Sequence, residues 1–449
     1  MKLAIFSAMK MFSKILAGQL YDPHLRQLVP NQLITVCRST GLITHVETFT
    51  ATTTTVFDDE TIDLRHLTLC PGFVDAHVHF FLHSYAETSW IDQLTKESLA
   101  ERTIRATVHA NRTLMAGYTS VRDLGTEGAE DADIGLRKSL SGPNPLIAGP
   151  RYFTANRAIV STGSYGPKGA VRVNKEGLDD VVGAEAADGP MECIRVVRRQ
   201  IGAGADCIKI YADYPVRSRL LDVSPRIAGK SIRTFNYDEL KILINTVHQY
   251  NLKIAAHAKT VPVMQDLLEL GIDSIEHGSE LHTSVEIINK LASPLCRTVW
   301  VPTLAAYYSI AQRTGDSSVW DTVKKSFQAV LAAGLGNVAI ACGGDTGVFN
   351  HGENALEMDL MVQLGAPWEW VLRWATLGGW ECIGGVLESE PDGGDNAVPF
   401  GWVKEGWAAD LVGLEGNLAT DFSATIRRVQ FVMKRGRVYK LRGKQVPLS

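Results

Sequence analysis

Two histidines lie two residues apart at the end of an apolar run, Pro71-Gly72-Phe73-Val74-Asp75-Ala76-His77-Val78-His79. On a β-strand, residues i and i+2 point to the same face, so both imidazoles can bind one metal ion. A single histidine is more often an ordinary polar side chain that bonds to a neighbour. The metal-site interpretation therefore requires further ligands from other strands.

A lysine occurs inside another apolar run, Ala205-Asp206-Cys207-Ile208-Lys209-Ile210-Tyr211. Lysine is almost never fully buried without a partner. Lys209 could be a neutral, hydrogen-bonded amine or one half of a salt bridge. Alternatively, its amine could have combined with carbon dioxide to form a carbamate, an anion whose two oxygens can bridge two cations.

Three more apolar runs end in a potential metal ligand, which is His257 in one run, His277 in the next and Asp345 in the last. Each has an ordinary explanation by itself, because an aspartate at a strand end can cap a helix and a histidine can bond to a backbone carbonyl. Their shared position at the ends of strands is harder to explain that way. Together with His77, His79 and Lys209 they predict one common site.

The elements that would position these residues are eight short, mostly continuous apolar runs separated by amphipathic stretches. Such runs are typical of strands buried on both faces of a parallel sheet. We predict strands at Gly72 to His79, Tyr118 to Asp123, Pro145 to Pro150, Asp206 to Tyr211, Leu252 to His257, Ile272 to His277, Thr298 to Thr303 and Asn337 to Asp345. Helices are predicted at Glu97 to Met115, Met191 to Ile201, Tyr237 to Tyr250 and Val261 to Leu270, the third with Asn236 and Glu239 as a cap. The alternation predicts an α/β protein with a (β/α)8 TIM barrel, whose chemistry lies at the C-terminal ends of its strands.

Both ends of the chain have a different pattern, with short β-type runs and turn signals but no helical period. We predict that residues 1–68 and 396–449 pair into one small discontinuous β-sandwich domain, and that residues 69–395 form the barrel. Two long connections, residues 151–190 and 212–236, are rich in Gly, Pro, Arg and Tyr and are expected to shape a substrate pocket. Arginines in these connections could bind a substrate carboxylate. These arginines are 151, 157, 172, 217, 219, 226 and 233.

Composition narrows the class of protein. Of 449 residues, 45% are hydrophobic and 21% are charged, and the formal net charge is -4, as in ordinary globular enzymes. Lysine and arginine are not in excess, which disfavours nucleic acid as a partner. No stretch is long and apolar enough for a membrane-spanning helix. Seven cysteines without C-x-x-C pairing favour a reducing compartment, and we expect a cytoplasmic protein, although the first residues could be a processed segment.

The candidate ligands and one closing motif carry a resemblance to a known family. They are the strand-one H-x-H, Lys209, His257, His277 and Asp345, and the motif Gly406-x-x-Ala409-Asp410-Leu411-Val412. Together they resemble the amidohydrolase superfamily, in its binuclear, carboxylated-lysine type. The resemblance covers nearly the whole chain. Two further stretches resemble the imidazolonepropionase-like branch, which includes proline- and arginine-type dipeptidases and fungal ochratoxinase. These are Gly117-Tyr118-Thr119-Ser120-Val121-Arg122-Asp123-Leu124 and His351-Gly352-Glu353-Asn354-Ala355-Leu356-Glu357.

The resemblance implies a role for each candidate ligand. His77 and His79 would bind one divalent ion with Asp345, His257 and His277 would bind a second, and a carbamate on Lys209 would bridge the two. Zinc suits imidazole ligands. A metal-bridging hydroxide would be the nucleophile, and Asp345 would shuttle its proton to the departing amine.

Several further residues are candidates for substrate contact or support. Tyr211 follows Lys209 by two and points to the same face, so it could donate to an oxyanion or pack in the core. Tyr165 stands where relatives commonly carry a histidine within Gly-His-Gly, and His351 could contact substrate or cap a helix. Arg122 and Asp123 are expected to form a structural pair beneath the site.

The predicted activity is hydrolysis of an amide C–N bond in a small peptide or an N-acyl amino acid. A lactonase or cyclic-amide hydrolase with the same site is the alternative enzyme. A catalytically inactive relative with an assembly or binding role is the non-enzyme alternative, disfavoured because all six ligand positions are filled. A homo-oligomer is plausible, but no stretch identifies an interface.

Overall fold

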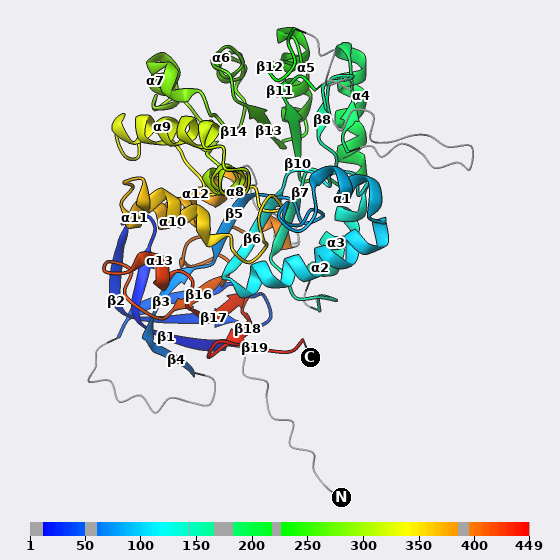
Figure 1. The fold of residues 1–449 in the computed structure, drawn as a ribbon. Helices are drawn as coiled ribbons and strands as arrows, with labels where there is room; N and C mark the ends of the chain where they lie inside the picture. The colour runs from blue at the N-terminus through cyan, green and yellow to red at the C-terminus, as the bar shows by residue number, and fades with distance from the viewer. Residues whose placement is uncertain are drawn as a thin grey trace, which may run out of the picture.

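A computed structural model describes residues 12–49, 61–142, 144–165, 183–217, 226–384 and 395–448. Its two chain ends pair in one eight-stranded sheet, in the order β19-β18-β17-β16-β4-β1-β2-β3 (Figure 1). The strands from the N-terminal end are β1 (Phe12–Asp22), β2 (Gln27–Cys37), β3 (Ile43–Thr48) and β4 (Thr61–Pro71). Those from the C-terminal end are β16 (Leu411–Leu414), β17 (Val429–Lys434), β18 (Arg437–Leu441) and β19 (Lys444–Gln445). Strands from both chain ends thus share one sheet, and one discontinuous β-sandwich domain made from residues 1–68 and 396–449 stays a prediction.

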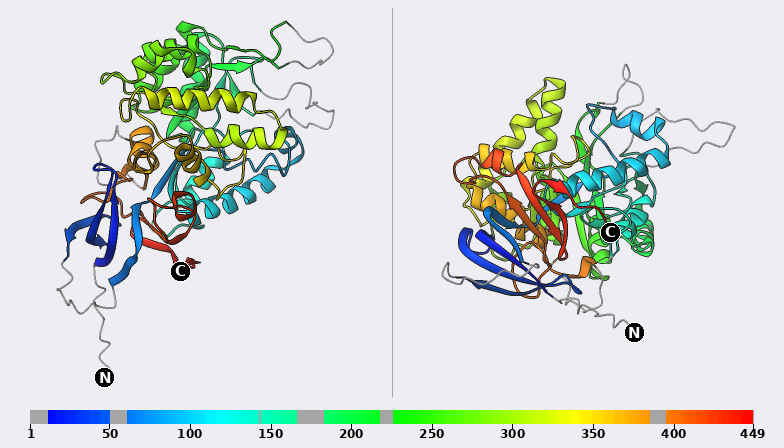
Figure 2. Two further views of the ribbon diagram at one scale, coloured as in Figure 1. Left: turned by 60° about the vertical axis from the view of Figure 1, so that its left-hand side comes forward. Right: turned by 90° about the horizontal axis from the view of Figure 1, so that it is seen from below.

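The junction between the two ends is the antiparallel pair β4 and β16, in which Cys70 lies opposite Val412. The side chains of this sheet enclose an apolar cluster that includes Ile15, Ile34 and Phe431. β4 ends at Pro71 and the next strand begins at Phe73, so the chain leaves the end sheet at Gly72. In Figure 2 the blue and red strands lie together at one side of the molecule.

The middle of the chain contains parallel strands that are buried along their whole length, as their continuous apolar runs require. One sheet has the order β5-β6-β7 and another has the order β15-β14-β13-β10-β8-β9. The strands of the first sheet are β5 (Phe73–Val78), β6 (Tyr118–Asp123) and β7 (Arg151–Thr154). Those of the second are β8 (Ile159–Val160), β9 (Glu185–Ala186), β10 (Cys207–Tyr211), β13 (Lys253–Ala258), β14 (Ser274–His277) and β15 (Val299–Val301). A separate hairpin is formed by β11 (Asp213–Pro215) and β12 (Ser231–Arg233).

Backbone hydrogen bonds connect these two sheets at both edges. The amide of Asp206 donates to Thr154 O at 2.8 Å, which joins β7 to the start of β10. On the other side, the amide of Trp300 donates to Ala339 O and the amide of Ala76 donates to Cys342 O, both at 2.8 Å. The segment before Asp345 therefore lies between β15 and β5.

This last segment was predicted as a strand, Asn337 to Asp345, but the structure gives it isolated bridges instead, at Ile340 and Thr346. Gly343 explains the irregular backbone, because a Cβ there would lie 2.5 Å from Val301 Cγ1 and 2.9 Å from His77 N. The third predicted strand, Pro145 to Pro150, was wrong as well, since the strand is β7, at Arg151–Thr154. The two prolines lack the amide donors that a central strand needs.

Helices cover the outer side of the parallel strands (Figure 1). They are α1 (Trp90–Lys96), α2 (Leu99–Met115), α3 (Ala132–Leu140), α4 (Gly189–Ala203), α5 (Tyr237–His248), α6 (Val261–Leu270), α7 (Val285–Leu291), α8 (Leu304–Thr314), α9 (Ser318–Ala332), α10 (Ala355–Gln363), α11 (Trp368–Trp374), α12 (Leu377–Ile383) and α13 (Phe422–Thr425), with 3-10 turns at Leu281–Thr283 and Asp395–Ala397. The four predicted helices correspond to α2, α4, α5 and α6. The predicted cap is a full capping box, because Asn236 and Glu239 bond to each other's backbone amides. The mixed α/β class is thereby confirmed.

The two long connections are described in part. Residues 166–182 and 218–225, with the predicted arginines 172 and 219, lie outside the described residues. No helix in the described part of the chain is long and apolar enough to cross a membrane.

Candidate active site

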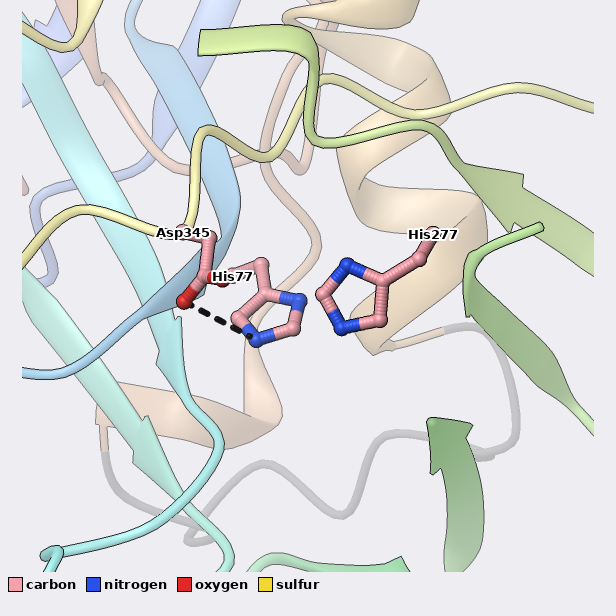
Figure 3. Close-up of side chains that lie close together, drawn as sticks. All are labelled: His77, His277 and Asp345. Atoms are coloured by element: carbon pink, nitrogen blue, oxygen red, sulfur yellow. Dashed lines mark ion pairs between the residues drawn. The ribbon is translucent and has the colours of Figure 1, made fainter. Parts of the chain in front are cut away.

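The six predicted ligands converge at one end of the parallel strands. His79 Nε2 lies 3.2 Å and His77 Nε2 lies 3.5 Å from Asp345 Oδ1. Donor atoms of His77, His277 and Asp345 all lie within 4.8 Å of one another, and Figure 3 shows the His77 ring between the other two side chains. The rings of His257 and His277 are 4.4 Å apart. His77, His277 and Asp345, which are far apart in the sequence, thus bring potential metal-binding atoms close together.

Three of the four imidazoles are oriented by a hydrogen bond at Nδ1. His77 Nδ1 bonds to Glu276 Oε2, His79 Nδ1 to Gly125 O and His277 Nδ1 to Thr303 Oγ1, each at 2.8 Å. A histidine that donates from Nδ1 keeps Nε2 as an acceptor, which is the usual arrangement of a metal ligand. The geometry therefore suits cation binding through Nε2.

Two buried atoms at the centre lack partners in the described residues. They are Lys209 Nζ and His257 Nε2. Buried polar atoms without a hydrogen bond are rare and costly. A cation for His257, and a carbamate on Lys209 that binds cations, would satisfy both atoms, so this donor set fits a divalent metal centre.

Burial dominates the electrostatics of these ligands. Desolvation lowers the pKa of Lys209 to about 8 and that of His77 to about 4, and it holds the pKa values of His257 and His277 well below the usual range. At His79 burial acts in the same direction, but the hydrogen bond and charge of Asp345 outweigh it and raise the pKa to about 9. Neutral imidazoles and an amine of lowered pKa are the forms that bind metals and react with carbon dioxide.

Glu276 supports His77 from beneath. Its second carboxylate oxygen accepts from Arg122 Nη2 at 2.7 Å and from Ser274 Oγ at 2.7 Å. Burial alone would raise the pKa of Glu276, but the charge of Arg122 and the bond to His77 hold it well below its usual range. The buried carboxylate is therefore ionised and orients His77.

The expected pair of Arg122 with Asp123 was wrong. Asp123 instead accepts from Tyr152 Oη at 2.7 Å and from the Phe80 amide at 2.8 Å. Adjacent residues of a strand point to opposite faces, so Arg122 and Asp123 cannot face each other.

The backbone is strained at several positions around the site. Glu127, His277, Thr303 and Asp345 have φ values of 50°, 75°, 54° and 59°. This left-handed region is unfavourable for residues with a Cβ, and such strain clusters at functional sites. The strained residues include two predicted ligands and the hydrogen-bond partner of one of them.

A cavity of about 400 Å³ opens above the ligands. Tyr165 and Tyr211, both predicted to contact substrate, line it together with Trp90, Tyr214 and Tyr307. The Tyr211 ring also stacks on His257, with 4.8 Å between centroids. The cavity therefore has a largely aromatic wall beside the candidate metal ligands.

His351 lies elsewhere. It is 4% exposed, bonds through Nε2 to Leu82 O at 2.8 Å and stacks on His109. It is not among the described residues that line the cavity. His351 therefore packs near the end of β5. Its position gives no support to the predicted contact with substrate.

Glu127 is a buried acid in the cavity that the sequence did not reveal. Its Oε2 accepts from Tyr165 Oη and from Trp90 Nε1, the latter at 3.0 Å, and its Oε1 accepts from Tyr211 Oη at 3.4 Å. No motif singled it out, because it follows β6 in an irregular loop. The one feature of the sequence that could have indicated Glu127 is its position four residues after Asp123, the end of the strand.

Two other charged residues of the site, Asp75 and Lys259, were also missed, whereas two of the predicted arginines are placed by the structure. Asp75 accepts from the amides of His77 and Gly344 and from Asn354 Nδ2, which ties β5 to the segment before Asp345. Among the arginines of the long connections, Arg217 lines the cavity, whereas Arg151 is buried against Asp410. Lys259 lines the cavity too.

In a comparison with known protein families, residues 68–439 match the amidohydrolase family. The ochratoxinase of Aspergillus niger is 28% identical over 398 residues, which cover 83% of this chain and 75% of that protein. Uncharacterized mycobacterial proteins are 26% identical over 310 residues, 66% of this chain and 69% of theirs.

Solved structures agree with the sequence comparison. A Xaa-Pro dipeptidase with methionine bound in its active site superposes with a TM-score of 0.77 and 27% identity, over 96% of this chain and 100% of that one. The structure of the Aspergillus niger ochratoxinase superposes with a TM-score of 0.75 and 22% sequence identity, over 96% of both chains. The chain therefore shares the fold of these proteins.

Proposed function

This chain belongs to the amidohydrolase family, and from that premise we propose that it is a binuclear metal-dependent hydrolase of the amide bond in a small peptide or an N-acyl amino acid. It is a hydrolase of carbon–nitrogen bonds, as its relatives indicate. The finer proposal concerns the metals, the mechanism and the substrate.

The observation that carries the proposal is the pair of orphaned buried atoms, Lys209 Nζ and His257 Nε2, within a cluster of imidazoles and a carboxylate. In this proposal His77, His79 and Asp345 hold one ion, and His257 and His277 hold the other. A carbamate on Lys209 would supply two further anionic oxygens to these ions. Zinc is the proposed metal because imidazole is its common ligand.

Bound divalent ions supply a water of lowered pKa and polarise the scissile carbonyl. The residues of the chain do the remaining work. Asp345 holds the proton released by the attacking water on its carboxylate and passes it to the departing amine. His79, 3.2 Å from Asp345 Oδ1, fixes that carboxylate in position.

The substrate carbonyl would lie beneath the aromatic wall of the cavity. Tyr211 is the proposed donor to the oxyanion, since its ring packs on His257. Its hydroxyl bonds to Glu127 at 3.4 Å, a long bond that a substrate oxygen can replace. Tyr165 closes the same wall at 4.8 Å from the Tyr211 ring.

A lactonase or cyclic-amide hydrolase would use the same residues. The prolidase-type and ochratoxinase relatives favour the open-chain amide. An inactive binding relative is disfavoured because all six ligand positions are filled in the sequence.

The proposed architecture is a (β/α)8 barrel of residues 69–395 with a small β domain of residues 1–68 and 396–449. The hydrogen bonds of Asp206 to Thr154 and of Ala76 to Cys342 support closure of the two parallel sheets into one ring. A crystal structure that left either edge open to solvent would contradict the barrel.

We also propose a reducing, cytoplasmic location. All seven cysteines are free thiols in the described residues. Recovery of the native protein from an extracellular fraction with disulfides would contradict this.

Two measurements test the function. Elemental analysis after purification without chelators is expected to find about two divalent metals per chain. A screen of dipeptides and N-acyl amino acids, with released amine as the readout, is expected to identify cleaved amides. A metal-free protein that remains folded and cleaves no member of the library would refute the proposal.

A further inference from the structure

Helix α8 begins without the usual side-chain cap. Its N-cap residue, Thr303, has a left-handed backbone, with φ 54° and ψ 42°, and its side chain makes no capping hydrogen bond. A threonine at this position ordinarily accepts a hydrogen bond from an amide of the first turn. The Thr303 hydroxyl is engaged elsewhere, because it accepts from His277 Nδ1 and donates to Pro302 O, both at 2.8 Å.

Glu357 of α10 provides the missing cap from a neighbouring helix. Its Oε2 accepts from the Ala305 amide at 2.7 Å, and its carboxyl group also accepts from the Leu304 amide. These are the first two amides of α8, which have no partner within their own helix. The Glu357 side chain is buried, and its Oε1 has no hydrogen-bond partner among the described residues. The contacts with α8 are therefore the ones that offset the cost of burying this polar group.

The start of α8 contributes to the candidate site in two ways. Thr303 orients the ring of His277, and the first turn of the helix places Ala306 and Tyr307 in the wall of the cavity. The Tyr307 ring lies edge-on to the His277 ring, with 5.8 Å between the centroids. A shift of this turn would therefore move the hydrogen-bond acceptor of His277 and one wall of the cavity together.

The backbone at this point needs support from its surroundings. The left-handed conformation is unfavourable for a β-branched residue such as Thr303, and it persists only where neighbouring contacts hold it. Trp300 Nε1 donates to His277 O at 3.0 Å, which holds the backbone of the histidine but not its ring. Without Glu357, the first amides of α8 would need another acceptor. If the Thr303 hydroxyl turned to cap them in the ordinary way, it would release His277 Nδ1.

We propose that Glu357 is a positioning residue that acts on His277 through Thr303. Because Glu357 caps α8 from α10, the Thr303 hydroxyl remains available to accept from His277. The imidazole then keeps its proton on Nδ1 and presents Nε2 to the proposed ion. The inference rests on the proposed function, in which His277 binds a metal.

Two substitutions interrupt this route at its two ends with side chains of similar size. Thr303→Val removes the acceptor of His277 directly, so one of the two zinc ions should bind about tenfold to a hundredfold more weakly. Glu357→Met acts indirectly, and zinc affinity should fall by about threefold to tenfold. Glu357→Gln keeps an acceptor oxygen for the α8 amides and should keep most of the affinity. Zinc titration in competition with a chromophoric chelator measures these affinities.

A double variant and a control separate the route from general stability. If both residues act through His277, Glu357→Met should add no further loss of zinc affinity to the Thr303→Val protein. Met358→Ala is the matched control, because Met358 is the next residue of α10 and is buried in the main core. It should lower the free energy of unfolding, measured with urea, and leave zinc affinity unchanged.

Three results would overturn the proposal. They are additive losses of zinc affinity in the double variant, an equal loss in Met358→Ala, and an unchanged affinity in Thr303→Val. The last result is decisive even if Glu357→Met does not fold.

Failure of the proposed function has a different signature. If the wild-type protein binds no zinc, the metal proposal is in error, and the ring of His277 still reports on the route. In protein with ¹⁵N-labelled histidine, the Nδ1 proton of His277, assigned by its absence in His277→Gln, should exchange slowly with water. It should exchange faster in Glu357→Met but not in Met358→Ala. Equal exchange in the wild type and Glu357→Met would refute the positioning role.

Discussion

The carboxylate of Glu276 lies 2.8 Å from Nδ1 of His77, although 199 residues separate the two in the sequence. His77 lies on β5 and Glu276 on β14, strands of two different sheets, and Arg122 binds the other carboxylate oxygen at 2.7 Å. A candidate metal ligand, its orienting acid and a buried counter-charge thus form one connected unit.

Replacement of Glu276 by Gln is expected to lower both the metal affinity and the stability of the protein. His77 loses an ionised acceptor, so metal affinity should fall about tenfold to a hundredfold. Arg122 loses its buried counter-charge, and the free energy of unfolding should fall by about 3 kcal/mol. Competitive zinc titration and urea unfolding measure the two effects. Glu286→Gln, on the exposed face of α7, is the control, and equal effects in both variants would contradict the role of Glu276.

Lys209→Ala is expected to remove the bridge between the two metal sites. Bound metal should fall from about two ions to one or fewer per chain, measured by elemental analysis. In the wild-type protein, a ¹³C carbamate signal should appear after equilibration with labelled bicarbonate and be absent in the variant. Two tightly bound ions in the alanine variant would exclude a bridging role.

Asp345→Asn is expected to separate binding from turnover. The amide oxygen can still contact a cation, so much of the metal should remain, whereas the proton carrier is lost. Amide hydrolysis should fall by a factor of about 10² to 10⁴. An assay of amide hydrolysis and an elemental analysis of the same sample measure the activity and the bound metal. Full activity in this variant would refute the proton-shuttle role.

Tyr165→Phe tests how the Tyr165 hydroxyl affects the Glu127 carboxylate in the cavity. Loss of the Tyr165 hydroxyl returns one acceptor position to the Glu127 carboxylate. The variant should bind an ammonium-bearing probe such as phenylglycyl-L-alanine up to about tenfold better relative to phenylacetyl-L-alanine. Steady-state KM values provide the measurement, and Tyr250→Phe on the surface is the control. An unchanged ratio would show that the Tyr165 hydroxyl does not limit the access of an ammonium group to Glu127.

Stability of the metal-free protein should fall between about pH 5 and pH 8. Burial raises the pKa of Glu357 from its ordinary value of 4.5 to about 8, against the hydrogen bonds from the Ala305 and Leu304 amides. Between these two pKa values, the folded state keeps a proton that the unfolded chain releases. The stability that this proton provides is fully present below the pKa of the unfolded chain and is lost as the pH rises through the pKa of the folded state.

Glu357→Gln removes this titration and isolates its contribution. The difference in unfolding free energy between the variant and the wild type should change by about 3 kcal/mol between pH 5 and pH 8, with the variant favoured at the higher pH. Urea unfolding in the presence of a chelator measures it. A difference that stays constant with pH would mean that Glu357 is ionised in the folded protein.

The sequence by itself determined which strands carry the candidate ligands. Apolar runs that end in His77 and His79, Lys209, His257, His277 and Asp345 are local patterns, since strand periodicity and burial depend on adjacent residues. The α/β class and the pairing of the two chain ends followed from the same patterns. So did the family resemblance, which the comparison over residues 68–439 confirms.

Tertiary structure alone decided which charges meet. Arg122 binds Glu276 rather than Asp123. Glu127 collects three donors, which are Trp90 of α1, Tyr165 and Tyr211 of β10. His351, placed by a motif, packs on His109 instead of lining the cavity. These contacts join residues far apart in the chain, and they depend on which strand ends become neighbours. Local periodicity fixes the face of a strand that a side chain occupies, but not the residue it meets across the fold.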